Sequence, residues 1–283
     1  MQPRNFRELL GAQWDEGKML CVGLDPDVEK IPAAARKNSI RETLVSFSAG
    51  IVDATHDLVC AFKPNAAFFE AYGVDGWAAL KEVIAYMHEH APGVPVILDA
   101  KRGDIKSTNE MYAKSVFDDL QADAVTVQPY MGGEPLAPFF ARKDKGIIVL
   151  CHTSNPGALE LQELEVGSEL LYKIVARRAA REWNGAGNCA VMVGATYPEQ
   201  LGEVRAIVGD MPILIAGVGA QNGDLEKTIR LGKDSNDAGL IVNAARSIIF
   251  ASSGADYAEA ARKKAQEYDG AIRSALIESP ATV

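Results

Sequence analysis

Short apolar runs rich in β-branched residues recur along almost the whole chain. A strand that is covered on both faces is apolar at nearly every position, and each of these runs has that pattern. The eight runs are residues 19–24, 58–62, 94–98, 124–127, 146–150, 190–193, 212–216 and 239–242. The pattern therefore predicts eight buried strands.

The segments between these runs have apolar residues at helical spacing. The predicted helices are residues 40–56, 76–90, 110–120, 168–183, 223–231 and 257–277. Strands that alternate with helices pair in parallel, and eight such units within about 250 residues are typical of a (β/α)8 barrel, the TIM barrel. A doubly wound open sheet is the alternative, but it usually has fewer strands and a nucleotide fingerprint, which this sequence lacks.

No linker, repeat or low-complexity tract interrupts the alternation. The longest insertions, residues 26–38 and 131–145, are too short for a second domain. We therefore expect residues 1–283 to form one α/β domain, a single (β/α)8 barrel.

Composition and charge narrow the range of partners. Apolar residues make up 48% of the chain, enough for a large core, and the formal net charge is 29 − 38 = −9. Without a basic run, the chain is a poor candidate for binding nucleic acid or an anionic membrane surface. The first residues lack the apolar core of a signal peptide, and no apolar run approaches the roughly 18 to 20 residues of a membrane span.

The four cysteines, Cys21, Cys60, Cys151 and Cys189, lie in or beside apolar, strand-like runs. No two of them have metal-ligand spacing, so we expect buried reduced thiols rather than disulfides or a zinc site. Reduced thiols are typical of a cytoplasmic protein.

The histidines give no sign of a metal site. His56, His88 and His90 fall in helical segments, where we expect them at the surface, and His152 has no partner at ligand spacing. No cofactor motif occurs either. A reaction that needs no metal and no cofactor, only a proton donor and fixed charges, is consistent with this set.

The most informative segment is residues 96–105, VILDAKRGDI, an apolar strand that ends in charged residues. Side chains alternate along a strand, so Asp99 and Lys101 point to the same face, at the end where α/β barrels hold their chemistry. Neighbouring acids keep Lys101 protonated, which suits a proton donor rather than a Schiff-base nucleophile. The segment predicts acid catalysis beside a developing negative charge.

Other charged residues follow predicted strands, and each also has a simpler explanation. Asp25 precedes Pro26, so its simpler explanation is that it opens a turn. Lys63 needs an anion, and Asp99 on the neighbouring strand is the nearest candidate, although the pair could be purely structural. Asp104 could merely favour a helix dipole.

The last two strand ends suggest a phosphate site. Residues 217–223, GVGAQNG, form a loop of small residues before a predicted helix, and its backbone N–H groups can approach an anion closely. Arg246 follows the eighth strand and offers a planar fork that matches phosphate oxygens. Many barrels hold a phosphate group at these two loops.

At this point the sequence resembles the orotidine 5′-phosphate decarboxylase family, in its longer bacterial branch. Residues 98–105 (LDAKRGDI) are similar to the family's D-x-K-x-x-D-I signature. Further matching motifs follow in the family's order, from residue 23 to residue 246. They are GLDP at 23–26, FKPN at 62–65, TSNPG at 153–157, GVGAQ at 217–221, and Arg246.

The resemblance implies decarboxylation of orotidine 5′-phosphate to UMP without metal or cofactor, in a cytoplasmic homodimer whose active sites lie at the subunit interface. The catalytic residues that it implies are Lys63, Asp99, Lys101 and Asp104. The implied substrate-binding residues are Asp25, Ile105, Thr108, Ser154, Gly219, Gln221 and Arg246.

The resemblance also implies how these residues divide their work. Asp104, Ile105 and Thr108 would reach into the partner's site. Asp25 and Lys63 would bind the ribose hydroxyls, and Ser154 would contact the pyrimidine. The 217–226 loop, including Gly219 and Gln221, would close over the 5′-phosphate, which Arg246 would also hold.

The sequence departs from the family's short branch at two positions near the phosphate. Ala216 and Ala245 stand where that branch often has Pro and Gly. Both residues are small, so we expect the approach to a phosphate to be retained.

Two other functions remain open. A metal-dependent phosphosugar barrel enzyme, such as a keto-gulonate-phosphate decarboxylase or a hexulose-phosphate synthase, shares the D-x-K-x-x-D element but needs further acidic ligands at strand ends. A barrel that only senses a nucleotide phosphate is the non-enzymatic alternative. Simple anion binding gives no reason for acids around Lys101.

Overall fold

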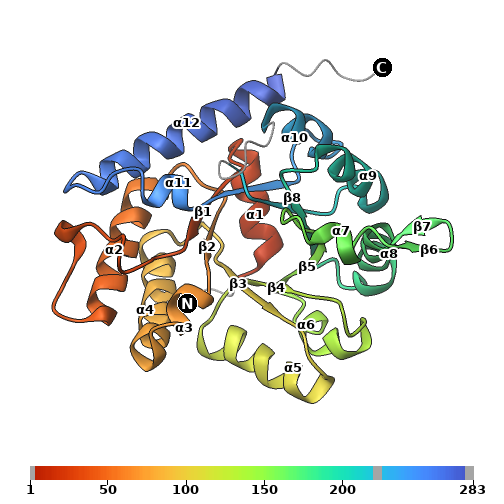
Figure 1. Cartoon of the computed structure of the whole chain (residues 1–283), viewed down its shortest axis with the longest axis horizontal. Helices are drawn as coiled ribbons and strands as arrows, with labels where there is room; N and C mark the ends of the chain where they lie inside the picture. Colours follow the sequence, from red (N-terminus) through yellow and green to blue (C-terminus); the bar gives the residue numbers. More distant parts are fainter. Residues whose placement is uncertain (1–3, 219–224, 278–283) are drawn as a thin grey trace.

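The computed structural model describes residues 4–218 and 225–277. Its main sheet consists of β1 (Leu20–Leu24), β2 (Ala61–Pro64), β3 (Ile97–Arg102), β4 (Ala124–Val127), β5 (Gly146–His152), β8 (Cys189–Gly194), β9 (Ile213–Ala216) and β10 (Leu240–Ala244). These eight strands are parallel and form a ring in the order β2-β1-β10-β9-β8-β5-β4-β3 (Figure 1). All eight predicted strands are present, so the (β/α)8 barrel is confirmed.

The barrel closes between β2 and β3. Two single bridges join these strands, one between Phe62 and Val96 and the other between Asn65 and Asp99. Lys63 of β2 lies between the bridged residues Phe62 and Asn65, the second of which follows the strand directly. Closure of the ring therefore brings Lys63 beside Asp99, although the two residues are far apart in the sequence.

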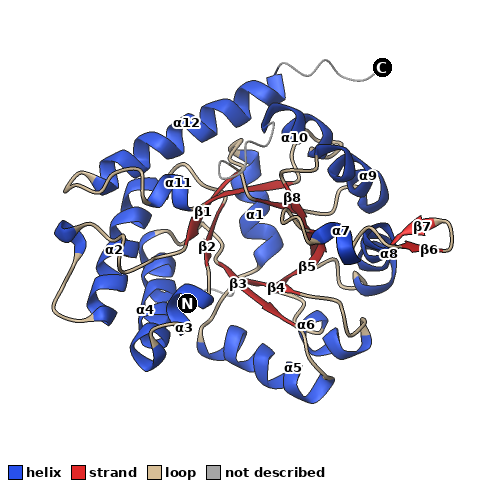
Figure 2. Cartoon of the chain, viewed as in Figure 1, coloured by secondary structure: helices blue, strands red, loops and turns tan. Residues whose placement is uncertain are grey.

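Helices surround the ring of strands (Figure 2). They are α1 (Phe6–Asp15), α2 (Ile40–Thr55), α3 (Ala67–Glu70), α4 (Gly73–His90), α5 (Lys106–Ala113), α6 (Ala137–Phe140), α7 (Ala158–Leu161), α8 (Leu171–Arg178), α9 (Pro198–Val208), α10 (Leu225–Gly232), α11 (Arg246–Ile249) and α12 (Tyr257–Ile277). Among the described residues, none of these helices is both long and apolar enough to cross a membrane.

Two hydrophobic cores hold the barrel together. The larger one lies between the strands and the outer helices. The smaller one fills the barrel interior and takes at least one residue from each strand: Cys21, Ala61, Ile97, Ala124, Ile148, Ala190, Met192, Leu214 and Ile241. Alternation along each strand sends neighbouring residues to opposite cores, which is why the strands are apolar throughout.

Helix α1 covers the amino ends of the strands. Its Phe6 and Leu10 are buried in the interior core, and the Trp14 indole donates a hydrogen bond to the carbonyl of Leu240 at the start of β10. In Figure 1 this helix is seen through the ring of strands. The bottom of the barrel is thereby closed, and only the carboxyl ends of the strands stay open for chemistry.

Several helix boundaries differ from the sequence-based predictions. Helix α5 begins at Lys106 rather than at residue 110, since its first turn is polar and has no apolar periodicity. The predicted helix 168–183 begins only at Leu171, because its first residues pair as β7 (Glu169–Leu170) with β6 (Glu165–Val166) in a small hairpin. Helices α1 and α9 were not predicted.

The expectation that His88 lies at the surface is wrong. Its side chain is 7% exposed, with Nε2 at 3.5 Å from Oδ2 of the fully buried Asp123. Arg4 donates to both carboxylate oxygens of Asp123 at 2.9 and 2.8 Å, and the N–H of Val96 donates to Oδ2 at 2.8 Å. Helical periodicity could not reveal this arrangement, because the acid that covers His88 comes from another part of the chain.

Asp123 ties the N-terminal segment to the start of β3. Burial alone would raise the pKa of Asp123, but the neighbouring His88 ring and the Arg4 guanidinium outweigh it and lower the pKa to about 2. The folded state therefore favours the ionised carboxylate. Its stabilising effect is fully present above the unfolded pKa of about 3.9 and is lost as the pH falls through the folded value.

We expect Asp123→Ala to lower the free energy of unfolding by about 3 kcal/mol at pH 7, because it leaves the part-buried Arg4 guanidinium without its anion and the buried N–H of Val96 unpaired. Urea unfolding measures this loss. The difference from the parent protein should shrink as the pH falls from about 4 towards 2. Asp118→Ala, which removes an exposed pair with Arg142, is the control and should cost less than about 1 kcal/mol. Equal losses in both variants would contradict this role of Asp123.

Candidate active site

The Asp99 carboxylate lies at the open end of the barrel between two lysines. Lys63 Nζ donates to its Oδ2 at 2.8 Å, and Lys101 Nζ donates to its Oδ1 at 2.7 Å. The predicted contact between Lys63 and Asp99 is confirmed. Asp99 and Lys101 also meet as predicted, although not by regular strand alternation, because the register of β3 shifts between Leu98 and Arg102.

The three groups differ sharply in exposure. The side chains of Lys63 and Asp99 are 4% and 5% exposed, whereas that of Lys101 is 45% exposed. Burial would raise the pKa of Asp99, but the charges of Lys63 and Lys101 outweigh it and hold the pKa well below its ordinary value. Burial would lower the pKa of Lys63, but Asp99 and Asp25 outweigh it and raise the pKa. The pKa shifts of Asp99 and Lys63 therefore favour their charged forms, and Lys101 is the accessible lysine of the cluster.

Asp25 lies just beyond β1, on the side of the cluster towards Arg246. Burial raises the pKa of Asp25, and the charge of Lys63 partly offsets this effect. Its Oδ1 is buried and has no hydrogen-bond partner in the part of the chain that the structure describes. An acceptor left free in this way does not fit a residue that only opens a turn, and it is suited to receive a hydroxyl from a ligand.

A cavity of about 450 Å³ connects Asp25 with Arg246. Arg246 is exposed at the first position of α11, directly after β10. The cavity is therefore lined by a half-buried acid with one buried, unpaired oxygen and by a guanidinium. Its remaining lining residues are Gly217, Val218, Asn243, Ala245 and Ser247.

Gly23 allows β1 and the segment after β10 to approach each other beside this cavity. A Cβ atom on Gly23 would lie 2.6 Å from the Cβ of Ala245 and 3.0 Å from Oδ1 of Asn243. Such distances are far below ordinary contacts. A glycine at position 23 is therefore required while Ala245 occupies its present place.

Among the described residues, the Ser154 hydroxyl has no hydrogen-bond partner, whereas the Thr153 hydroxyl does. The Thr153 hydroxyl donates to Asn155 Oδ1 at 2.7 Å and accepts from Gln162 Nε2 at 2.9 Å. Ser154 Oγ makes no hydrogen bond to any described residue, and it lies 3.2 Å from where a Cβ of Gly217 would be. Of these two neighbours, Ser154 is thus the one available to a ligand at the strand ends.

Asp104 does not join the cluster of its own chain. Its Oδ1 accepts the N–H of Ile105 at 2.6 Å, and no ion pair within the described residues links it to Lys101. The sequence suggested a lysine between two acids, but only Asp99 contacts Lys101 here. The segment 104–108 lies at the start of α5, with Ile105 53% exposed, so these side chains are available to a neighbouring molecule.

Gly219 and Gln221, which the sequence assigned to a phosphate site, lie outside the described residues.

Two buried polar residues of the site were missed by the sequence analysis. Thr126 on β4 donates to Asp99 Oδ1 at 2.9 Å, and Asn243 on β10 lines the cavity beside Arg246. Each is the single polar residue inside an apolar strand and points into the barrel. That position was the available signal, because a buried polar group needs a partner.

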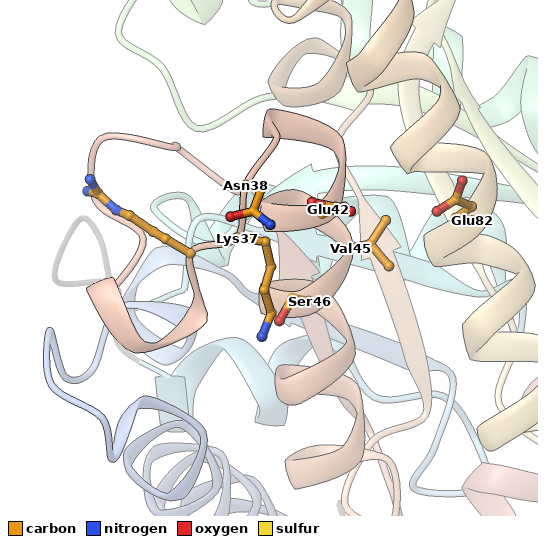
Figure 3. A pocket seen from close by; sticks show the side chains of 7 residues that line it. Lys37, Asn38, Glu42, Val45, Ser46 and Glu82 are labelled. Atoms are coloured by element: carbon orange, nitrogen blue, oxygen red, sulfur yellow. The ribbon is translucent and has the colours of Figure 1, made fainter.

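A separate hollow lies outside the barrel and is not part of this site. Figure 3 shows it between α2, α4 and the segment before α2. It is lined by Arg36, Lys37, Asn38, Glu42, Val45, Ser46 and Glu82, none of which stands on a strand. Within residues 4–218 and 225–277, no group of three His, Cys, Asp or Glu side chains is arranged to hold a metal ion.

Fold and site together define a (β/α)8-barrel protein whose charged site lies at the carboxyl ends of the strands. The family model "Orotidine 5'-phosphate decarboxylase / HUMPS family" matches residues 18–264. The orotidine 5′-phosphate decarboxylase of Ralstonia pickettii is 51% identical over 261 residues, covering 92% of this chain and 95% of that protein. The chain therefore belongs to the orotidine 5′-phosphate decarboxylase / HUMPS family.

Solved structures agree with this assignment. The structure of Leishmania donovani OMP decarboxylase matches with a TM-score of 0.84 at 37% identity, covering 97% of this chain and 100% of that one. The structure of Leishmania donovani UMP synthase matches with a TM-score of 0.87 at 39% identity and covers 99% of this chain. This chain spans only 58% of that synthase.

We expect Gly23→Ala to destabilise the protein by about 1–3 kcal/mol, because its methyl group would overlap Ala245. Ala245→Gly removes that methyl contact, so the double variant should be less destabilised than the sum of the two single variants. Urea unfolding of all four proteins measures the coupling. Strictly additive losses would show that the two residues do not press on each other.

Proposed function

We propose that this chain catalyses the decarboxylation of orotidine 5′-phosphate to UMP, with Lys101 as the group that acts at C6 of the pyrimidine. The observation that carries the proposal is the Asp99 carboxylate held between buried Lys63 and exposed Lys101. Close relatives with about half of their residues identical are orotidine 5′-phosphate decarboxylases. Within the family, these relatives favour this reaction over a phosphosugar reaction.

The reaction calls for a fixed positive charge. When CO2 leaves C6, the electron pair stays in the plane of the ring, where no π system can delocalise it. Stabilisation must then be electrostatic, from preorganised charge aimed at C6. Lys101 can supply this charge because its ammonium is anchored by Asp99 and accessible from the open end of the barrel. The same ammonium then gives a proton to C6, which yields UMP.

The charge accounts for only part of the rate. At an effective dielectric of about 20, a unit charge about 4 Å from the developing negative charge stabilises it by roughly 4 kcal/mol, which raises the rate by about three decades. Binding of the distant phosphate can supply a further part by positioning the substrate and excluding water. Repulsion between Asp99 and the substrate carboxylate adds little to this proposal, since ground-state destabilisation is contested.

The cavity supports the assignment of the binding residues. Asp25, with its free buried oxygen, and Lys63 would bind the ribose hydroxyls, and Arg246 would hold the 5′-phosphate at the other end of the cavity. The free hydroxyl of Ser154 would contact the pyrimidine. Gly219 and Gln221 would complete the phosphate site.

The test is formation of UMP from orotidine 5′-phosphate in buffer that contains EDTA. We expect the parent protein to turn over at full rate there, because the charges that it uses belong to side chains. Lys101→Ala should lower kcat by at least about three decades while the far-UV circular dichroism and the unfolding midpoint stay close to those of the parent.

Other outcomes would be decisive against the proposal. Loss of UMP formation on chelation, with recovery on adding Mg²⁺, would contradict a mechanism that uses side-chain charges alone. Tight UMP binding without any turnover would indicate a nucleotide sensor. Turnover retained in a folded Lys101→Ala variant would remove Lys101 from its role.

We also propose a homodimer whose active sites are shared between subunits. Among the described residues, Asp104 makes no ion pair with Lys101 of its own chain, so it is available for the site of a partner together with Ile105 and Thr108. Large apolar side chains around this segment are exposed, as expected of an interface. They are Ile105, Met111, Tyr130 and Met131.

Sharing can be tested by mixing the Lys101→Ala and Asp104→Ala proteins. Each is expected to be inactive alone, but a hybrid dimer contains one site with native Lys101 and native Asp104. After full subunit exchange, about one quarter of parent activity should return, since half of the dimers are hybrids with one intact site each. Subunit exchange is verified with two differently tagged proteins. Confirmed exchange without recovery would place Asp104 in the site of its own chain.

A cytoplasmic location and a single domain complete the proposal. The four cysteines are free and buried, which is typical of a protein from a reducing compartment.

A further inference from the structure

Strand β3 bulges where it carries the catalytic charges. Leu98 pairs with Val125 and Arg102 pairs with Val127, and the register shifts between these two pairs. Three residues of β3, Asp99 to Lys101, therefore lie opposite the single residue Thr126 of β4. Backbone groups in such a bulge lose their ladder partners and need others.

Thr126 supplies the missing partners from its side chain. Its Oγ1 accepts the N–H of Ala100 at 3.0 Å and the N–H of Lys101 at 2.9 Å. The same hydroxyl donates to Asp99 Oδ1 at 2.9 Å. One fully buried hydroxyl thus uses its donor and both acceptor sites, all on the segment 99–101.

The backbone that Thr126 holds is strained. Lys101 has a φ of 46°, in the left-handed region that residues with a Cβ rarely adopt. Such a conformation costs about 1–3 kcal/mol and persists only where the surroundings enforce it. The two N–H groups that Thr126 accepts belong to Lys101 itself and to Ala100, the residue before it. The hydroxyl therefore binds the backbone at the strained position.

We propose that Thr126 is a positioning residue, which fixes the ammonium of Lys101 by holding the β3 bulge and the Asp99 carboxylate together. The hydroxyl does not need to touch the substrate. It holds the backbone N–H groups of Ala100 and Lys101 in place. It also holds the Asp99 carboxylate, to which the Lys101 ammonium is hydrogen-bonded. This inference rests on the proposed role of Lys101.

The test compares Thr126→Val with Thr126→Ser. Valine keeps the shape and removes the hydroxyl, whereas serine keeps the hydroxyl and removes a methyl group. We expect Thr126→Val to lower kcat for orotidine 5′-phosphate about 100-fold with KM changed less than about threefold, because a displaced catalytic group costs about this much. Thr126→Ser should stay within about threefold of the parent in kcat.

The outcomes separate the possible roles. A Thr126→Val protein that unfolds more readily but keeps parent kcat would show a merely structural hydroxyl and overturn the proposal. So would a Thr126→Ser protein as slow as Thr126→Val. If Thr126→Val does not fold, Thr126→Ala takes its place, and a kcat equal to that of the parent would again overturn the proposal.

The Lys101→Ala protein distinguishes the two levels of inference. If it is inactive while Thr126→Val is fully active, only the role of Thr126 fails. If it is active, the proposed catalytic role of Lys101 fails first.

Discussion

The site depends on one interaction, the sharing of the Asp99 carboxylate among two lysines and a threonine. A single buried carboxylate would be costly, and a buried lysine equally so, but together they remain charged where burial alone would neutralise them. Lys63 and Thr126 lie inside the barrel wall and hold Asp99 in place. Asp99 in turn holds Lys101, the member of the cluster that reaches the open end.

This arrangement constrains the barrel itself. The ring closes between β2 and β3 by single bridges rather than by a continuous ladder, and the cluster lies at that closure. The ion pair between Lys63 and Asp99 therefore joins the two strands where backbone pairing is weakest. The neighbouring bulge in β3 frees Lys101 from regular alternation at the cost of backbone hydrogen bonds, which the side chain of Thr126 replaces.

Much of the fold was predictable because its signals are local. A strand between two cores is apolar at every position, so each of the eight runs could be recognised by itself. The contact between Lys63 and Asp99 followed from placing charged residues at the ends of parallel strands. Helix α1 and the buried His88 escaped prediction because their partners come from distant segments. The role of Thr126 escaped it because a register shift leaves no mark in the sequence of either strand.

The two lysines around Asp99 have the same chemistry and different tasks, and exposure is what separates them. Lys63 is buried, and its charge interacts with Asp99 and Asp25. Its ammonium is therefore not accessible to the reacting carbon. Lys101 has nearly half of its side chain exposed, and its backbone lies in the left-handed region. An ammonium must be both accessible and immobile to act on a charge that forms only in the transition state. Lys101 is accessible because its own side chain is not buried. It is held in place because the buried Lys63 and Thr126 fix Asp99, which binds its ammonium.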